Sequence, residues 1–317
     1  GDHRDLHKEY RRQRQMCIRD SFLDACSQFM QANNLQKSIM NKIKLAALQL
    51  QLNKTDNLDF LLNQLDDLIK RRDDLDLIIL SELAVGGAGA KNCNHPLKNY
   101  EKIFSEFAKN NSIFLIPGTF YEEDGHKIFN VSPVFNREGE LIAKAKKIYP
   151  WLPYEIDVDS SDEICVFNFE NKGNIGIHIC YDLWFPETAR ALAIAGAELI
   201  INPTMTPTKD RDIETVMVQA TAAQQQCYYV DLNGSGEQGV GKSLICDFEG
   251  SVIDKANKEN KILEAEIDFD KVKEARIKGF MGLGQPLKSF RDYPFNPVNY
   301  MNKEYLDSLG DLKKDKE

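Results

Sequence analysis

The sequence predicts an α/β fold in which helices are layered on mixed β-sheets. Short apolar runs alternate along the chain with longer segments whose apolar residues recur at helical spacing. Hairpin signals stand between several of these runs, an interleaving typical of sheets that contain both parallel and antiparallel strands. With 317 residues, the chain is long enough for one large core or two modest ones.

The predicted elements follow one another in a regular order from Lys42 onward. A strand at Ile43–Leu50 precedes a helix whose leucines recur three or four residues apart between Leu58 and Ile69. Further strands are predicted at 75–80, 113–120, 129–135, 140–143, 165–169, 175–180, 199–201, 227–232, 244–246 and 252–253. Turn residues at 136–139, 170–174 and 249–250 join three pairs of them as hairpins. Helices are expected before residue 113, from about 185 to 195, and around 213–223.

The two ends of the chain differ from this pattern. Residues 1–40 form an extension outside the core, of which residues 1–21 are polar and rich in arginine. Residues 11–21 resemble translated adapter sequence, so we interpret Met40 as the native start. The alternative for this stretch is a basic nucleic-acid-binding arm, whose charge the neighbouring acids dilute. Residues 282–317 combine prolines, glycines and aromatic residues with a charged tail, and we expect an extended arm that packs on this subunit or on a neighbour.

Composition excludes several function classes. The formal charge is −9, and an acidic surface repels phosphate backbones, so no nucleic-acid partner is expected. No apolar run approaches the roughly 18 residues of a membrane span, so no membrane partner is expected either. Seven cysteines without a CxxC pair indicate neither a disulfide framework nor a zinc site. These features favour the reducing cytoplasm and a site without a metal ion.

Three residues suggest nucleophilic chemistry. Cys180 lies between a predicted strand and a helix start, where a turn exposes a sulfur at the edge of a sheet and aims backbone N–H groups at it. A thiol needs a base, and Glu82 follows directly after another predicted strand. Lys147 precedes an aromatic loop and would stabilise negative charge on the attacked oxygen. Each residue type alone is more often structural, so the prediction rests on their joint occurrence.

With these motifs the sequence resembles the nitrilase superfamily of carbon–nitrogen hydrolases, whose triad is Glu–Lys–Cys. The resemblance covers about residues 42–276 and is carried by Cys180-Tyr181-Asp182, Phe185-Pro186-Glu187, Arg190, the stretch 196–200 and Asn202-Pro203. The stretch Lys147–Glu155 is most similar to the aliphatic amidase and formamidase branch. Ser81 stands where the family commonly has proline, which puts the geometry of this loop in question.

The resemblance implies a fold, a reaction and a set of roles. The fold is a four-layer α-β-β-α sandwich with two mixed sheets, formed by residues 41–281. Glu82 is the general base, Lys147 the oxyanion partner, Cys180 the nucleophile and Glu155 an orienting acid, and the backbone N–H of Tyr181 completes the oxyanion hole. The reaction is the hydrolysis of small carboxamides to acid and ammonia through a thioester, without a cofactor. A homodimer or larger homo-oligomer is expected.

Several alternatives remain open at this stage. Nitriles or carbamoyl amides suit the same triad, and a non-catalytic scaffold with the same fold is a further class. Gly236–Ser243 matches the phosphate-binding pattern GxxxxGK[ST], but the residues after Ser243 predict a strand where nucleotide binding needs a helix. We therefore favour a glycine-rich loop at the rim of the site.

The remaining side chains near the motifs have structural or pocket-lining interpretations. Trp151 and Trp184, together with Tyr154, are expected at the pocket mouth, with packing in the core as the alternative. We interpret Asp182 and Arg190 as a buried structural pair, and His178 as a core histidine with its polar atoms satisfied.

Overall fold

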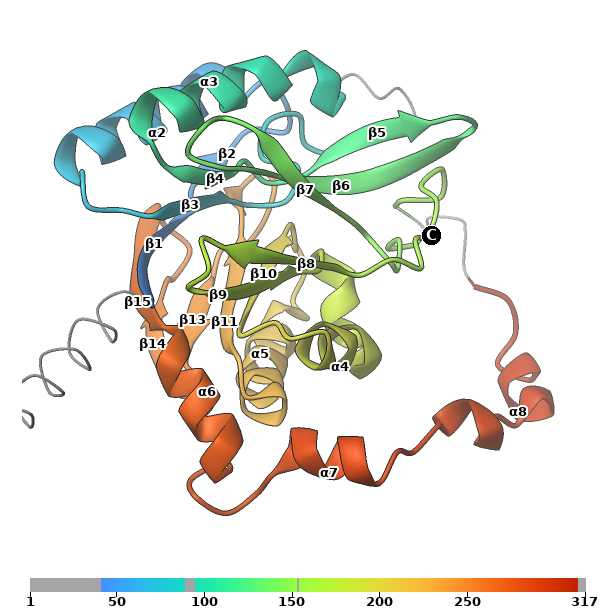
Figure 1. The fold of residues 1–317 in the computed structure, drawn as a ribbon. Coiled ribbons are helices and arrows are strands. Elements are labelled where there is room, and N and C mark those ends of the chain that lie inside the picture. Colours follow the sequence, from blue (N-terminus) through green and yellow to red (C-terminus); the bar gives the residue numbers. More distant parts are fainter. Residues whose placement is uncertain (1–40, 89–94, 153, 313–317) are drawn as a thin grey trace, which may run out of the picture. The chain divides into compact units, whose positions relative to one another are not determined.

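The computed structural model describes residues 41–88, 95–152 and 154–312, so the predicted N-terminal extension lies outside the described residues. From Ile43 onward these residues form one compact unit. Two β-sheets organise it (Figure 1). The strands of the first sheet are, in spatial order, β15 (Lys261–Asp268), β1 (Lys42–Gln49), β3 (Leu77–Leu80), β4 (Phe114–Ile116), β6 (Lys127–Phe135) and β5 (Phe120–Asp124), with β7 (Leu141–Lys146) also paired to β6.

The second sheet has the same mixed character. Its strands are, in spatial order, β14 (Val252–Lys255), β13 (Leu244–Cys246), β11 (Tyr228–Asn233), β10 (Leu199–Thr204), β9 (Gly173–Ile177) and β8 (Cys165–Phe169). Strands β9, β10 and β11 run parallel, whereas β8 and β13 pair with them antiparallel. A short parallel pair joins β2 (Gln51–Leu52) to β12 (Ser235–Gly236).

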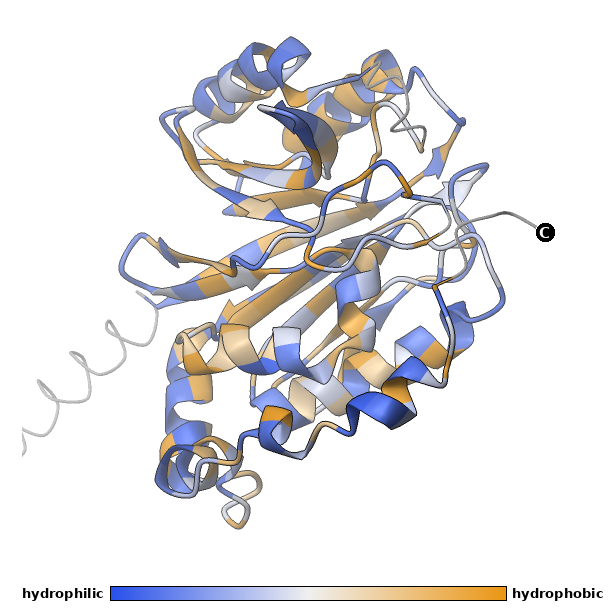
Figure 2. Ribbon diagram, turned by 90° about the vertical axis from the view of Figure 1, so that its right-hand side faces the viewer, coloured by the Kyte–Doolittle hydropathy of each residue, from blue (hydrophilic) through white to orange (hydrophobic). Residues whose placement is uncertain are grey.

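Helices cover the outer face of each sheet. The helices α2 (Leu58–Arg71) and α3 (Glu101–Asn111) pack on the first sheet, and a 3-10 turn η2 (Leu97–Asn99) precedes α3. The helices α4 (Pro186–Ile194) and α5 (Arg211–Gln225) pack on the second sheet. The predicted α-β-β-α sandwich is therefore confirmed, and Figure 2 shows the apolar strands stacked between the helical layers.

Strand β1 illustrates why the strands appear in the sequence as apolar runs. Ile43, Leu45 and Ala47 contact the second sheet, whereas Ala46 and Leu48 contact the helices. A strand covered on both faces has no side that favours polar residues. Separate apolar clusters therefore lie on the two faces of β1.

The prediction of a single strand at residues 113–120 is wrong, because this segment contains parts of two strands. The structure divides it into β4 and β5, and Gly118 turns the chain between them with φ of 84°. A Cβ atom at Gly118 would lie 2.1 Å from the carbonyl oxygen of Ser81. Gly118 therefore allows the chain to approach the segment that carries Glu82.

The C-terminal part contains elements that the sequence did not predict. Strand β15 is followed by α6 (Phe269–Lys278), whose first turn is capped by the Asp268 carboxylate. The expected extended arm contains α7 (Pro286–Asp292), a 3-10 turn η4 (Pro297–Tyr300) and α8 (Lys303–Asp307). Among the described residues, no helix is both long and apolar enough to cross a membrane.

Candidate active site

The four predicted catalytic residues line one cavity of about 280 Å³. Glu82 follows the end of β3, and Lys147 follows the end of β7. Cys180 begins η3 (Cys180–Trp184), the 3-10 turn between β9 and α4. Glu155 lies in the loop that continues from Lys147. The fold therefore brings together side chains from both sheets that are far apart in the sequence.

Lys147 is held between two carboxylates. Its Nζ lies 2.9 Å from Oε1 of Glu82 and 2.7 Å from Oε2 of Glu155, and its side chain is only 2 % exposed. Burial by itself lowers the pKa of Lys147, but the negative charges of Glu155 and Glu82 outweigh it and raise the pKa well above its usual value. Lys147 is thus a fixed cation beside the cavity.

Asn130 also joins the two carboxylates, and the sequence analysis missed it. Its Nδ2 donates to Oε1 of Glu82 at 2.9 Å and to Oε1 of Glu155 at 3.0 Å. Glu155 also accepts the backbone N–H of Trp151 at 2.7 Å. The only sequence signal for Asn130 is an amide side chain inside an apolar strand, β6, where a buried polar group needs a partner.

Cys180 has an unusual backbone conformation. Its φ is 52°, in the left-handed region that residues with a Cβ atom rarely adopt. Such a conformation persists where the surrounding structure holds it in place, and it is common at functional sites. Here it turns the sulfur toward the Glu82 carboxylate and the backbone N–H of Met205.

The electrostatics of the cavity keep the thiol protonated at rest. Burial raises the pKa of Cys180 well above its usual value, and the negative charge of Glu82 adds to this. Burial also raises the pKa of Glu82, while the positive charge of Lys147 opposes the shift. A thiol beside a carboxylate of raised pKa is a pair suited to proton transfer, because neither group holds its charge easily.

The aromatic residues expected at the pocket mouth lie in two places. Trp151 and Tyr154 line the main cavity and stack with ring centroids 4.5 Å apart. Tyr181 and Trp184 line a second, small cavity of about 10 Å³, which also includes Cys180 and Trp151. The predicted role of the Tyr181 backbone N–H stays a prediction.

One of the two structural interpretations near Cys180 is wrong. Asp182 and Arg190 form no ion pair within the part of the chain that the structure describes. The Asp182 carboxylate instead accepts the backbone N–H groups of Ile148, Tyr149 and Ile179, and burial raises its pKa to about 6. It thereby ties the loop after Lys147 to the turn that carries Cys180. Arg190 donates to the Gln224 carbonyl.

His178 is a core histidine, as expected. Its Nδ1 lies 3.1 Å from Oγ1 of Thr188, and its Nε2 contacts the Tyr229 hydroxyl. Burial lowers the pKa of His178 to about 3, so the ring is neutral.

The segment Gly236–Ser243 does not form a phosphate-binding loop. Strand β13 begins directly after Ser243, so no helix N-terminus faces the loop. The Ser243 hydroxyl contacts Oε1 of Gln49 at 2.8 Å, and Lys242 pairs with Asp212. Glu237 and Gln238 line the main cavity, which confirms the interpretation as a loop at its rim. Across residues 41–88, 95–152 and 154–312, no three metal-ligating side chains are grouped as a site.

Several known proteins are similar to this chain. The family model described as "Carbon-nitrogen hydrolase" matches residues 44–277. The chain is 31 % identical to omega-amidase NIT2 of Mus musculus over 187 residues, which cover 54 % of this chain and 67 % of that protein. It is 27 % identical to 2-oxoglutaramate amidase of Paenarthrobacter nicotinovorans over 254 residues, covering 74 % and 86 %. The crystal structure of Saccharomyces cerevisiae Nit3, a nitrilase-superfamily member, superimposes with a TM-score of 0.68 at 24 % identity, covering 74 % of this chain and 93 % of that one.

Proposed function

Because this chain belongs to the carbon–nitrogen hydrolase family, we propose that it is an amidase that hydrolyses small carboxamides to acid and ammonia through Cys180. One observation carries the proposal, namely that Glu82, Lys147 and Cys180 converge on a single cavity. These residues supply a base, a cation and a nucleophile, which are the groups that acyl transfer requires. The amidases among its relatives support the choice of an amide over other carbonyl substrates.

Acylation begins with the thiol beside Glu82. Glu82 takes the proton of Cys180 as the sulfur attacks the amide carbon, and the carbonyl oxygen becomes an oxyanion. Lys147 and the backbone N–H of Tyr181 stabilise this charge, and Glu155 with Asn130 keeps Lys147 and Glu82 in place. The C–N bond then breaks, Glu82 passes its proton to the leaving nitrogen, and ammonia departs from a thioester.

Deacylation uses the same groups in reverse. Glu82 accepts a proton from a water molecule as its oxygen attacks the thioester carbon, and Lys147 again stabilises the oxyanion. The C–S bond breaks, the sulfur recovers its proton from Glu82, and the acid is released. No step needs a cofactor or a change of oxidation state.

The cavity limits the size of the substrate. A volume of about 280 Å³ lies just below the ~300–1,000 Å³ typical of small-molecule sites. Its walls include the apolar side chains of Leu83, Met205 and Pro207, which suit a short aliphatic acyl group. Nitriles and carbamoyl compounds would use the same three residues, so a panel of amides, nitriles and carbamoyl compounds decides the class by ammonia release.

Intact-mass spectrometry after quenching with an amide tests the covalent step. We expect a transient increase by the mass of the acyl group on the wild-type chain and none on Cys180→Ala, which should also lose turnover. The Cys165→Ala variant is the matched control, because Cys165 is a free cysteine on β8 outside the cavity. Normal turnover by Cys180→Ala contradicts the proposal.

We also propose that the enzyme is a homodimer or larger homo-oligomer of the cytoplasm that acts on small molecules. The described arm exposes large apolar side chains, with Tyr293 82 % and Tyr300 75 % exposed. Exposed apolar patches of this kind are typical of association surfaces. Sedimentation velocity is expected to give more than one chain per particle, and Tyr293→Ser with Tyr300→Ser should shift the particles toward monomers.

A further inference from the structure

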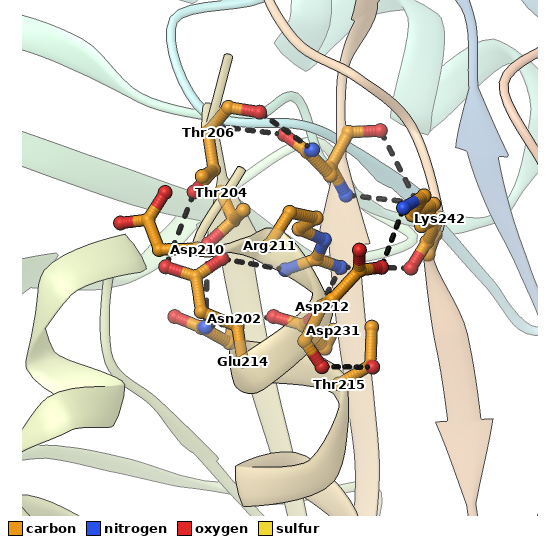
Figure 3. A network of polar contacts seen from close by, with 12 residues as sticks. Asn202, Thr204, Thr206, Asp210, Arg211, Asp212, Glu214, Thr215, Asp231 and Lys242 are labelled. Carbon is orange, nitrogen blue, oxygen red and sulfur yellow. Dashed lines mark hydrogen bonds and ion pairs between the residues drawn. The ribbon is translucent and has the colours of Figure 1, made fainter. Parts of the chain in front are cut away.

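A buried ion-pair network surrounds Arg211, and the proposed reaction does not use it (Figure 3). Arg211, the first residue of α5, contacts the carboxylates of Glu214 and Asp231, and its side chain is 1 % exposed. Its guanidinium also donates to the carbonyl groups of Gly241 and Lys242. Charges buried this deeply need every partner, so the network is rigid and fixes the Glu214 carboxylate.

Glu214 extends from this network toward the two segments that flank the sulfur. On one side, its Oε1 accepts the indole N–H of Trp184 at 3.1 Å, and Trp184 belongs to the turn that Cys180 begins. On the other side, the same oxygen accepts the hydroxyl of Thr206 at 3.3 Å. Thr206 follows Met205, whose backbone N–H faces the sulfur.

Two further observations bring Glu214 close to the nucleophile. Glu214 and Cys180 line the same small cavity of about 10 Å³, together with Trp184 and Thr206. The negative charge of Glu214 is also among the causes that raise the pKa of Cys180.

We propose that Glu214 is a positioning residue of the reaction, which holds Trp184 and Thr206 and thereby fixes the Cys180 sulfur between Glu82 and the Met205 N–H. The inference rests on the proposed function. The Arg211 network then has a role in the reaction, because it anchors the Glu214 carboxylate, which joins the segment of Trp184 to that of Thr206.

The charged groups around Cys180 and Glu214 determine in which direction the pKa of the thiol moves when Glu214 is replaced. Those that face Cys180 are Glu82, Lys147 and Glu214. Those that face Glu214 are Arg211 and Asp231, and Asp210 shares the small cavity. In Glu214→Gln the charge of Arg211 is still balanced by Asp231, while one negative charge that opposes the thiolate is lost. The pKa of the thiol is therefore expected to fall.

The first experiment measures kcat and the pH dependence of iodoacetamide alkylation of Cys180 in Glu214→Gln. We expect kcat to fall tenfold to a hundredfold with KM within about threefold, while the alkylation midpoint moves to lower pH. If the variant is slower although its thiol ionises more easily, the loss of rate comes from misplacement of the sulfur and not from poorer ionisation. A purely structural role of Glu214 would not produce this combination. Asp212→Asn is the matched control, because Asp212 lies in the same turn of α5 but faces Lys242 outside the cavity, and it should change neither quantity.

Thr206→Val supplies an independent arm, because it removes one hydrogen bond and keeps the charge. We expect a threefold to tenfold lower kcat with an unchanged alkylation midpoint, and little further loss when it is combined with Glu214→Gln, since both act through one contact. Wild-type kcat in Glu214→Gln overturns the inference, as does an unmoved alkylation midpoint. If Glu214→Gln does not fold, wild-type kcat in Thr206→Val overturns it.

The failure of the proposed function would look different. In that case the wild-type chain releases no ammonia from any compound of the panel. The pH dependence of alkylation would still report the effect of Glu214 on Cys180 in that case, because alkylation by iodoacetamide needs no amide substrate.

Discussion

Replacing Lys147 by methionine tests the central arrangement of the site. Methionine keeps most of the length of the side chain and removes its charge. The Lys147 ammonium is paired at 2.9 Å with Glu82 and at 2.7 Å with Glu155, and both carboxylates are nearly as buried as the lysine. The substitution therefore leaves two buried carboxylates without their shared cation.

The magnitude follows from this burial. Removing one partner of a buried ion pair costs about 3–5 kcal/mol of the free energy of unfolding, because the remaining charge is left uncompensated. The loss of an oxyanion partner costs about 2.7–4 kcal/mol of transition-state stabilisation, or about 10²–10³ in kcat. The pKa of Glu82 is already raised above its ordinary value, and losing the cation raises it further. A group with such a raised pKa stabilises the fold at low pH and less so as the pH increases, so the deficit should grow from pH 5 to pH 8.

Urea denaturation and amide turnover measure the two effects separately. In Lys147→Met/Glu155→Gln one of the uncompensated charges is gone, so part of the stability should return while activity stays lost. Lys146→Met is the matched control, because Lys146 is the neighbouring residue, lies over the Phe129 ring and pairs with the exposed Asp124 at 3.6 Å. Such pairs contribute about 0–1 kcal/mol. Equal losses of stability in the two methionine variants would refute the reasoning.

Four further predictions concern other parts of the chain. Asn130→Ala should lower kcat/KM about tenfold to a hundredfold, since each hydrogen bond to a charged group contributes about 1.5–3 kcal/mol, and steady-state kinetics checks this. Gly241→Ala should destabilise the chain more than Gly125→Ala in urea denaturation, because both have positive φ but only at Gly241 would a Cβ atom lie 2.5 Å from a carbonyl oxygen. His178→Gln should reduce the slope of the free energy of unfolding against pH by about 1.4 kcal/mol per pH unit between pH 4 and 6, because there the unfolded histidine binds a proton that the folded one, with a pKa of about 3, does not. ATP at millimolar concentration should leave the melting temperature unchanged, and saturable binding that Lys242→Ala removes would contradict our interpretation of that loop.

Local patterns were sufficient to place two of the groups that line the cavity. Glu82 follows a predicted strand and Cys180 ends another before a helix start, so the positions of these two residues could be inferred from the order of apolar runs and turn residues. For Lys147 the sequence indicated only the aromatic loop that follows it, because the predicted strand ended at residue 143 whereas β7 continues to Lys146. The α/β layers could be predicted in the same way, because strands covered on both faces read as apolar runs.

The contacts between these groups could not be predicted in the same way. Asn130 reaches Glu82 only because the register of β6 turns its side chain toward that end of β3. Glu214 reaches Trp184 because α5 packs against the turn that carries Cys180. Both contacts depend on how distant elements are aligned, which one sequence does not display. The predicted ion pair between Asp182 and Arg190 was wrong for the same reason. The actual partners of Asp182 are backbone N–H groups, which the residue types in a sequence do not indicate.

The pairing of Lys147 with two carboxylates also bears on how the reaction ends. Two negative groups facing one positive group leave the surroundings of the sulfur with an excess of negative charge. An amide enters as a neutral molecule and meets no repulsion from this excess. Its hydrolysis yields a carboxylate in the same place, next to the buried Glu82, and like charges close to each other at a buried site repel. The site that binds the reactant thus disfavours the product, which promotes turnover without a moving part.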